Sequence, residues 1–144
     1  MQISIDCAEP ERLVPFWCLA LDYEPAPAPD GATTWRVWYL SVGIAEGELG
    51  DGDCADQIRD PLGAGPPIWF QPVPEAKTVK NRVHLDVQVG GGRSVPVEQR
   101  QVVVRAKAAQ LLAAGGVVLR ELNEVEGHFG VTMRDPEGNE FCIT

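Results

Sequence analysis

The sequence predicts an α+β fold made of two tandem βαβββ modules. The second half of the chain shows a strand, a helix and three strands, and the first half allows the same assignment. Two short segments also recur in the same order: ISID at 3–6 resembles VHLD at 83–86, and RDPLG at 59–63 resembles RDPEG at 134–138. Similarity at a fixed separation is typical of a duplicated structural unit.

The first module starts with an alternating apolar and polar segment, 2–7, which predicts a strand with one apolar face. A helix is expected over 9–21, where Pro10 suits the first turn. Pro15 lacks a backbone donor, so this helix is expected to be short or kinked.

The middle of the first module is harder to assign. Residues 24–32 are rich in proline and predict an exposed connection. The aromatic residues of 33–43 fit both strand and helix spacing, and we favour a helix. Residues 56–73 then indicate a strand, a turn and a second strand that ends near Gln71.

The second module follows a polar segment, 74–81, and opens with a cleanly alternating strand at 82–89. The helix formers of 97–116 predict a helix that stops at Gly115. Three further strands are predicted at 117–122, 128–134 and 139–143. We therefore expect module one at 1–73, a linker at 74–81 and module two at 82–144.

Composition excludes several classes of function. The 144 residues suit one domain, and the net charge of −9 disfavours nucleic acid as a partner. No apolar run approaches a membrane span and no signal peptide is visible, so we expect a cytoplasmic protein without a membrane partner. The four cysteines form no CxxC pair and are expected to be free thiols.

The HLDV segment that opens module two and the closing DPEGNEFCI resemble the glyoxalase/bleomycin-resistance/extradiol-dioxygenase group, the vicinal oxygen chelate superfamily. PEAKTVKNRVHLDVQVGGGR is similar to its uncharacterised glyoxalase-like domain set. The resemblance covers nearly all of 1–144 and is weakest across 24–56, which looks like an insertion. It implies one glyoxalase-like domain whose curved mixed sheet surrounds a cleft, with the helices outside, and a homodimer.

Strand alternation assigns side chains to the two faces of this expected sheet, because successive side chains point to opposite sides. The helix-covered core should receive Ile3, Ile5, Cys7, Val83, Leu85, Val87, Val89, Phe129, Val131, Met133, Phe141 and Ile143. The other face should carry Gln2, Ser4, Asp6, His84, Asp86, Gln88, His128, Gly130, Thr132, Glu140 and Cys142. The resemblance implies that this second face, together with Trp69 and Gln71, lines the cleft.

Both histidines of the chain are thus expected in the cleft, where imidazole can exchange protons near neutral pH. We predict His84, His128 and Glu140 as catalytic residues. The predicted substrate-binding residues are Trp38, Trp69, Gln71, Asp86 and Thr132.

A divalent metal is the open question of this site. In metal-dependent members the last strand supplies a carboxylate four residues after the glycine of the Asp-Pro-x-Gly turn, but here that position is Cys142. The resemblance implies a ligand set of His84, Gln71, Cys142 and either Gln2 or Ser4. Such a set suits magnesium, manganese or iron poorly, whereas zinc accepts Cys and His. Zn, Ni, Mn or Fe remains an option that we do not favour.

Two functions follow from the resemblance. The first is binding of a small organic molecule in the cleft, with lyase or isomerase chemistry on a small oxygenated substrate or a relationship to the dioxygenases. The alternative is metal-free sequestration of a planar or aromatic compound, as in bleomycin resistance, in which tryptophan rings supply the stacking surface.

Overall fold

A computed structural model of the chain describes residues 1–123 and 127–144. The structure confirms the predicted α+β fold with two tandem modules. It has two compact units, Met1–Ala76 and Lys77–Thr144, each with one four-stranded mixed sheet. The boundary falls within the expected linker 74–81.

The sheet of the N-terminal unit has the strand order β1-β4-β3-β2. Its strands are β1 (Ile3–Cys7), β2 (Glu24–Pro25), β3 (Gln57–Arg59) and β4 (Ile68–Pro72). β1 and β4 run parallel, and the other neighbours are antiparallel. The sequence left one strand of the first module unassigned, and the structure shows that this strand is β2. The insertion lies between β2 and β3.

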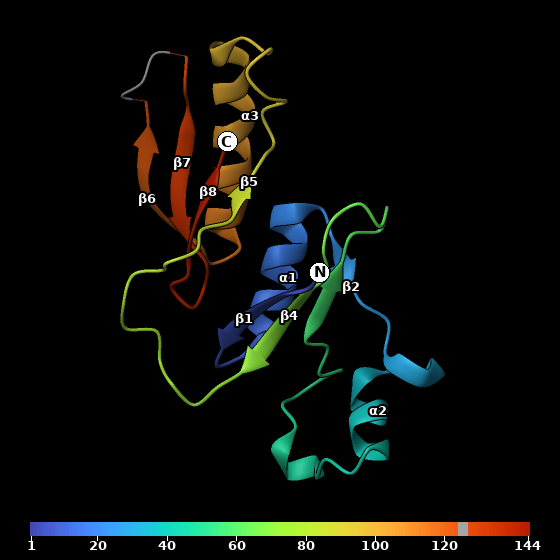
Figure 1. Cartoon of the computed structure of the whole chain (residues 1–144). Coiled ribbons are helices and arrows are strands. Elements are labelled where there is room, and N and C mark those ends of the chain that lie inside the picture. Colours follow the sequence, from blue (N-terminus) through green and yellow to red (C-terminus); the bar gives the residue numbers. More distant parts are fainter. Residues whose placement is uncertain (124–126) are drawn as a thin grey trace. The chain divides into compact units, whose positions relative to one another are not determined.

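One apolar face of this sheet packs against helix α1 (Pro10–Leu21) (Figure 1). Ile58, Ile68 and Phe70 of the sheet are almost fully buried. So are Leu13, Phe16, Trp17 and Ala20, which recur at the spacing of one helical face. The helix expected over 9–21 is confirmed. Of the two effects expected of Pro15, shortening is wrong: α1 continues through the proline for 12 residues, with Pro15 on an exposed part of the helix surface.

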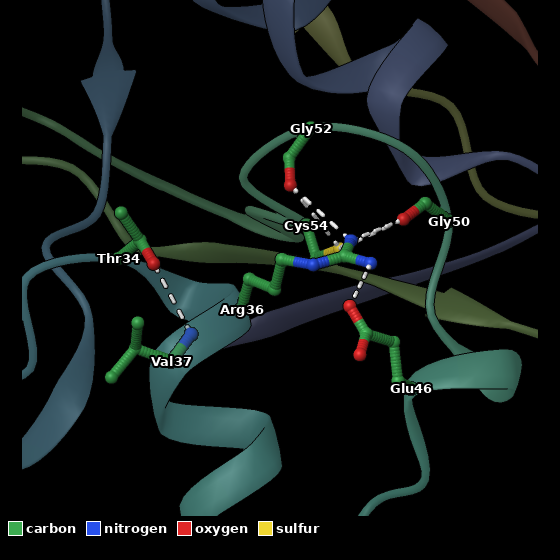
Figure 2. Close-up of polar contacts among 7 residues, drawn as sticks. All are labelled: Thr34, Arg36, Val37, Glu46, Gly50, Gly52 and Cys54. Carbon is green, nitrogen blue, oxygen red and sulfur yellow. Dashed lines mark hydrogen bonds and ion pairs between the residues drawn. The ribbon is translucent and has the colours of Figure 1, made fainter.

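The insertion contains the predicted helix of 33–43, which is confirmed as α2 (Trp35–Ser41), together with the short 3₁₀ turns η1 (Pro29–Gly31) and η2 (Glu46–Glu48). Thr34 caps α2, because its side chain accepts a hydrogen bond from the Val37 amide at 3.1 Å. Figure 2 shows that the Arg36 side chain contacts several residues of the loop that follows α2. Its guanidinium donates to Gly50 O at 2.7 Å and contacts Glu46 Oε1 at 3.2 Å.

The C-terminal unit has the strand order β5-β8-β7-β6. Its elements are β5 (Asp86–Val87), α3 (Val97–Ala113), β6 (Val117–Leu122), β7 (Gly130–Arg134) and β8 (Glu140–Ile143). β5 and β8 run parallel, as β1 and β4 do in the first unit. α3 packs on the sheet through Val104, Ala108 and Leu111, against a core that includes Val87, Phe129, Val131, Met133, Phe141 and Ile143.

The two predicted turns have the same role in both units. Asp60 accepts hydrogen bonds from the amides of Leu62, Ala64 and Gly65, and Asp135 accepts from those of Glu137 and Asn139. An aspartate that binds the backbone after it stabilises a tight turn. The repeated Asp-Pro-x-Gly segments thus close equivalent hairpins.

Two predictions for the second module need correction. Val83 was expected in the core but is 76% exposed, because the regular strand begins only at Asp86. From Leu85 onward the alternation holds: Leu85, Val87 and Val89 are at least partly buried, and the polar residues between them are exposed. The strand predicted at 128–134 starts at Gly130, so His128 precedes it and alternation does not assign His128 to a face.

Candidate functional site

The face of the C-terminal sheet opposite α3 brings several predicted site residues into two rows. Register pairs Thr132 of β7 with Cys142 of β8 and Cys142 with Asp86 of β5. Paired residues on adjacent strands point to the same side of a sheet. The 3.6 Å distance between Thr132 Oγ1 and Cys142 Sγ agrees with this placement.

The second row is centred on Glu140, which is paired in register with Arg134. The Glu140 carboxylate bonds to Lys80 Nζ and lies 3.3 Å from Arg134 Nη2. His84, two residues before Asp86, places Nε2 3.7 Å from Glu140 Oε2. The predicted catalytic residues His84 and Glu140 therefore face each other, with two cations beside them.

These contacts hold Glu140 in its ionised form. The hydrogen bond from Lys80 lowers the pKa of the Glu140 carboxyl, and Arg134 adds to this effect. A carboxylate stabilised in this way is a weak proton donor near neutral pH. The carboxylate is therefore a negatively charged neighbour of the His84 imidazole, with Oε2 3.7 Å from Nε2.

The segment before β5 is attached to β8 by the same cluster. Asn81 Oδ1 accepts a hydrogen bond from the Glu140 amide at 3.2 Å, next to the contact between Lys80 and Glu140. An open hollow of about 500 Å³ is lined by Val79, Lys80, Asn81 and Arg82. Residues 74–81 are predicted only as a linker, and no local pattern in the sequence indicates Lys80 or Asn81 as site residues. For Arg134, the sequence offers one signal of a contact with Glu140: the two residues flank the same tight turn and so come opposite each other in the hairpin.

The N-terminal sheet repeats this arrangement with different side chains. Ser4 is paired with Trp69, and Asp6 with Gln71, on the face opposite α1. By position, Asp6 corresponds to Asp86 and Gln71 to Cys142. Ser4 then corresponds to His84, so the repeat favours Ser4 over Gln2, which lies before β1. The roles suggested for Gln2, Ser4 and Gln71 stay predictions.

Trp69 is held by a buried carboxylate, Asp56, that no motif in the sequence indicates. Asp56 precedes β3 and is 5% exposed. Its Oδ2 accepts hydrogen bonds from Trp69 Nε1 at 2.7 Å and from the Tyr39 hydroxyl at 2.6 Å. Its Oδ1 is buried without a hydrogen-bond partner among the described residues. Burial is the main cause that raises the pKa of Asp56.

Trp38, the other tryptophan predicted to bind substrate, lies on α2 within the insertion. Its indole Nε1 donates to Asp30 Oδ2 at 3.0 Å, and its ring packs against Trp35 and Tyr39 at centroid distances of 5.7 and 5.1 Å. These contacts give Trp38 a structural role in the insertion, and substrate binding by this residue stays a prediction.

The residues of the C-terminal unit do not fit a divalent metal centre. Within residues 1–123 and 127–144, no three His, Cys, Asp or Glu side chains are grouped as metal ligands. Glu140 already binds Lys80 and Arg134, and these positive charges oppose a cation near His84. The predicted set His84, Gln71, Cys142 and Gln2 combines residues of both units, and its assembly is untested.

None of the described helices is both long and apolar enough to cross a membrane.

Comparison with known proteins gives a match over almost the whole chain. Residues 2–144 match the family model described as "Glyoxalase-like domain". No curated protein sequence is significantly similar.

Solved structures with a similar fold include a glyoxalase/bleomycin resistance protein/dioxygenase family enzyme from Burkholderia phytofirmans PsJN. The identity is 13% and the TM-score 0.58, and the alignment covers 99% of this chain and 94% of that one. A hypothetical protein from S. aureus is 15% identical, with a TM-score of 0.58 and coverage of 99% and 93%. The fosfomycin resistance protein FosX from Listeria monocytogenes is 13% identical, with a TM-score of 0.61 and coverage of 99% and 87%. At these identities the similarity shows the fold.

Proposed function

The chain belongs to the family of glyoxalase-like domain proteins, and from this premise we propose that it binds a small oxygenated organic molecule on the helix-free sheet face of the C-terminal unit. His84 acts there as the proton acceptor of a lyase or isomerase reaction. The observation that carries the proposal is the 3.7 Å approach of His84 Nε2 to the buried, ionised Glu140.

The chemistry divides between these two residues. His84 is the group that takes a proton from a carbon next to a carbonyl, because imidazole accepts protons near neutral pH. Glu140 stays ionised beside Lys80 and Arg134 and stabilises the imidazolium that results. The neighbouring row of Thr132, Cys142 and Asp86 supplies a hydroxyl, a thiol and a carboxylate to contact the bound molecule.

Solvent-exchange NMR tests this function without knowledge of the natural substrate. Hydroxyacetone in D₂O should gain deuterium at the carbon next to its carbonyl faster with the protein than without it. His84→Ala should abolish the acceleration, and His128→Ala should keep it. If only His128→Ala abolishes the exchange, His128 is the proton acceptor, and the assignment to His84 is wrong.

The second candidate function is sequestration of an aromatic compound without turnover. It is favoured by the indole of Trp69, which Asp56 fixes in place beside β1. A thermal-shift series of aromatic compounds and 1,2-dicarbonyls, followed by NMR of the same mixtures, separates the two functions. Binding that leaves every compound chemically unchanged, with no exchange at any carbon, would support sequestration over catalysis.

A further inference from the structure

The strongest unexplained feature outside the His84 cluster is the buried Oδ1 atom of Asp56. Oδ2 of the same carboxylate is fully engaged by Tyr39 and Trp69, whereas Oδ1 has no partner among the described residues. Leaving a buried acceptor unpartnered costs about 1–3 kcal/mol, more when the group is charged. Such an atom needs an explanation in a bound molecule or in the function of the protein.

The surroundings of Asp56 are aromatic. Tyr39 and Trp69 contact the carboxylate directly, and Tyr39 packs against Trp35 and Trp38 with centroid distances of 5.9 and 5.1 Å. Tyr39 and Trp69 are both partly exposed, so two of the side chains that contact the buried Asp56 reach the surface. The carboxylate meets these two rings at their polar edges, through the Tyr39 hydroxyl and the Trp69 indole N–H. A carboxylate with a remaining acceptor oxygen among aromatic side chains can accept a hydrogen bond from an ammonium group.

The charge of the N-terminal unit supports a positively charged ligand. Residues 1–76 contain three Lys or Arg and thirteen Asp or Glu, a net charge of −10, whereas residues 77–144 contain nine and eight, a net charge of +1. Each of the three cations, Arg12, Arg36 and Arg59, already has a carboxylate partner. The unit therefore attracts cations and has no spare basic side chain of its own to offer Asp56.

We propose that the N-terminal unit holds a subsite for an organic ammonium group, with Asp56 Oδ1 as the hydrogen-bond acceptor and the rings of Trp69 and Tyr39 beside it. The inference rests on the proposed small-molecule binding and names the class of molecule: an amine that carries an apolar or aromatic body. Trp69 then has two roles. Its indole N–H fixes the carboxylate, and its ring lies on the sheet face shared with Ser4 and Gln71.

Calorimetry with three matched probes tests the subsite: phenethylamine, the neutral 2-phenylethanol and the anionic 3-phenylpropionate. Phenethylamine should bind about tenfold or more tightly than either other probe, because a hydrogen bond to a charged group contributes about 1.5–3 kcal/mol. Equal affinity for phenethylamine and 2-phenylethanol would overturn the proposal. The His84-dependent deuterium exchange is measured in a separate NMR experiment. A failure of the ammonium subsite can therefore be distinguished from a failure of the proposed function.

Two variants separate the subsite from the general negative charge. Asp56→Asn should weaken phenethylamine about tenfold, whereas Asp51→Asn removes the same charge from an exposed turn and should have little effect. If both variants weaken phenethylamine equally, the binding reflects only long-range attraction by the negative charge, and the proposed subsite is wrong. If Asp56→Asn does not change the affinity, Oδ1 binds only a buried water, and the proposal is also wrong. In the unmodified protein, phenethylamine should shift the indole N–H resonance of Trp69 in NMR spectra, which avoids any folding defect of the variants. An unshifted resonance at saturation would contradict the proposal.

Discussion

Glu140 of β8 and His84, which lies two residues before β5, approach each other in the C-terminal unit, with Oε2 and Nε2 3.7 Å apart. They are close because β5 and β8 run parallel in a fixed register, in which Asp86 pairs with Cys142. The chain just before β5 still follows β8, since the Cys142 amide donates to Leu85 O at 2.9 Å, and His84 therefore comes beside Glu140. The contact is therefore a consequence of strand pairing, and four predictions follow from it and from the other contacts described above.

Glu140→Gln should lower the stability of the protein near neutral pH and make that stability less sensitive to acid. The lowered pKa of Glu140 means that the folded state binds fewer protons than the unfolded state around the ordinary value of 4.5. This contribution is fully present above that pH and is lost as the pH falls through the lower, folded-state pKa. Urea unfolding between pH 3 and 7 should show a smaller acid-side loss of stability in Glu140→Gln than in the unmodified protein. Parallel curves would contradict the role assigned to Lys80.

Asp56→Asn should have the opposite pH dependence. The raised pKa of Asp56 means that the folded state keeps its proton above the ordinary value of 3.8, so stability is lost as the pH rises through the folded-state pKa. Asparagine does not titrate. The free energy of unfolding of the variant relative to the unmodified protein should therefore be higher at pH 8 than at pH 4. Asp60→Asn is a matched control of the opposite sign, because backbone amides lower the pKa of Asp60.

Arg36→Ala should release the loop of the insertion. The guanidinium contacts Gly50, Gly52 and Glu46, and it lies 3.5 Å from Cys54 Sγ (Figure 2). Limited proteolysis and amide exchange should both become faster across 44–54. Arg36→Lys should not restore protection, because an ammonium lacks the planar fork that reaches several acceptors. Arg12→Ala, which removes an exposed pair with Glu9, should leave exchange in 44–54 unchanged.

Leu111→Ala should destabilise the core beneath α3. Leu111 is fully buried, and truncation of a buried leucine costs about 2–5 kcal/mol because it removes apolar contacts and leaves a cavity. Leu112→Ala is the neighbouring control, since Leu112 is 54% exposed and the change should stay within about 0.5 kcal/mol. Guanidinium unfolding of both variants measures the difference. A Leu112→Ala effect as large as that of Leu111→Ala would contradict the packing of α3.

Local patterns in the sequence predicted much of the fold. Strand patterns located β1, β4, β7 and β8, and alternation within the last of these separated Phe141 and Ile143 from Glu140 and Cys142. Helix formers located α3 and, with weaker evidence, the spacing of aromatic residues located α2. The predictions failed at Val83 and at Pro15, where the neighbouring structure outweighed local propensity. The true length of β5 was set by its pairing with β8, and α1 continued because its apolar face is buried on the sheet.

The sequence by itself determined the family, the repeat and the side of the sheet on which Glu140, Cys142 and Thr132 lie, because side chains of a strand alternate between its two faces whatever surrounds it. Only the tertiary structure decided which side chains meet across long separations along the chain. Lys80 reaches Glu140 from 60 positions away, and Tyr39 and Trp69 reach Asp56 from 17 and 13 positions away. Such contacts depend on the path of the chain between elements, which no local pattern encodes. They also set the ionisation of both carboxylates, since one meets cations and the other is buried with one oxygen unpartnered.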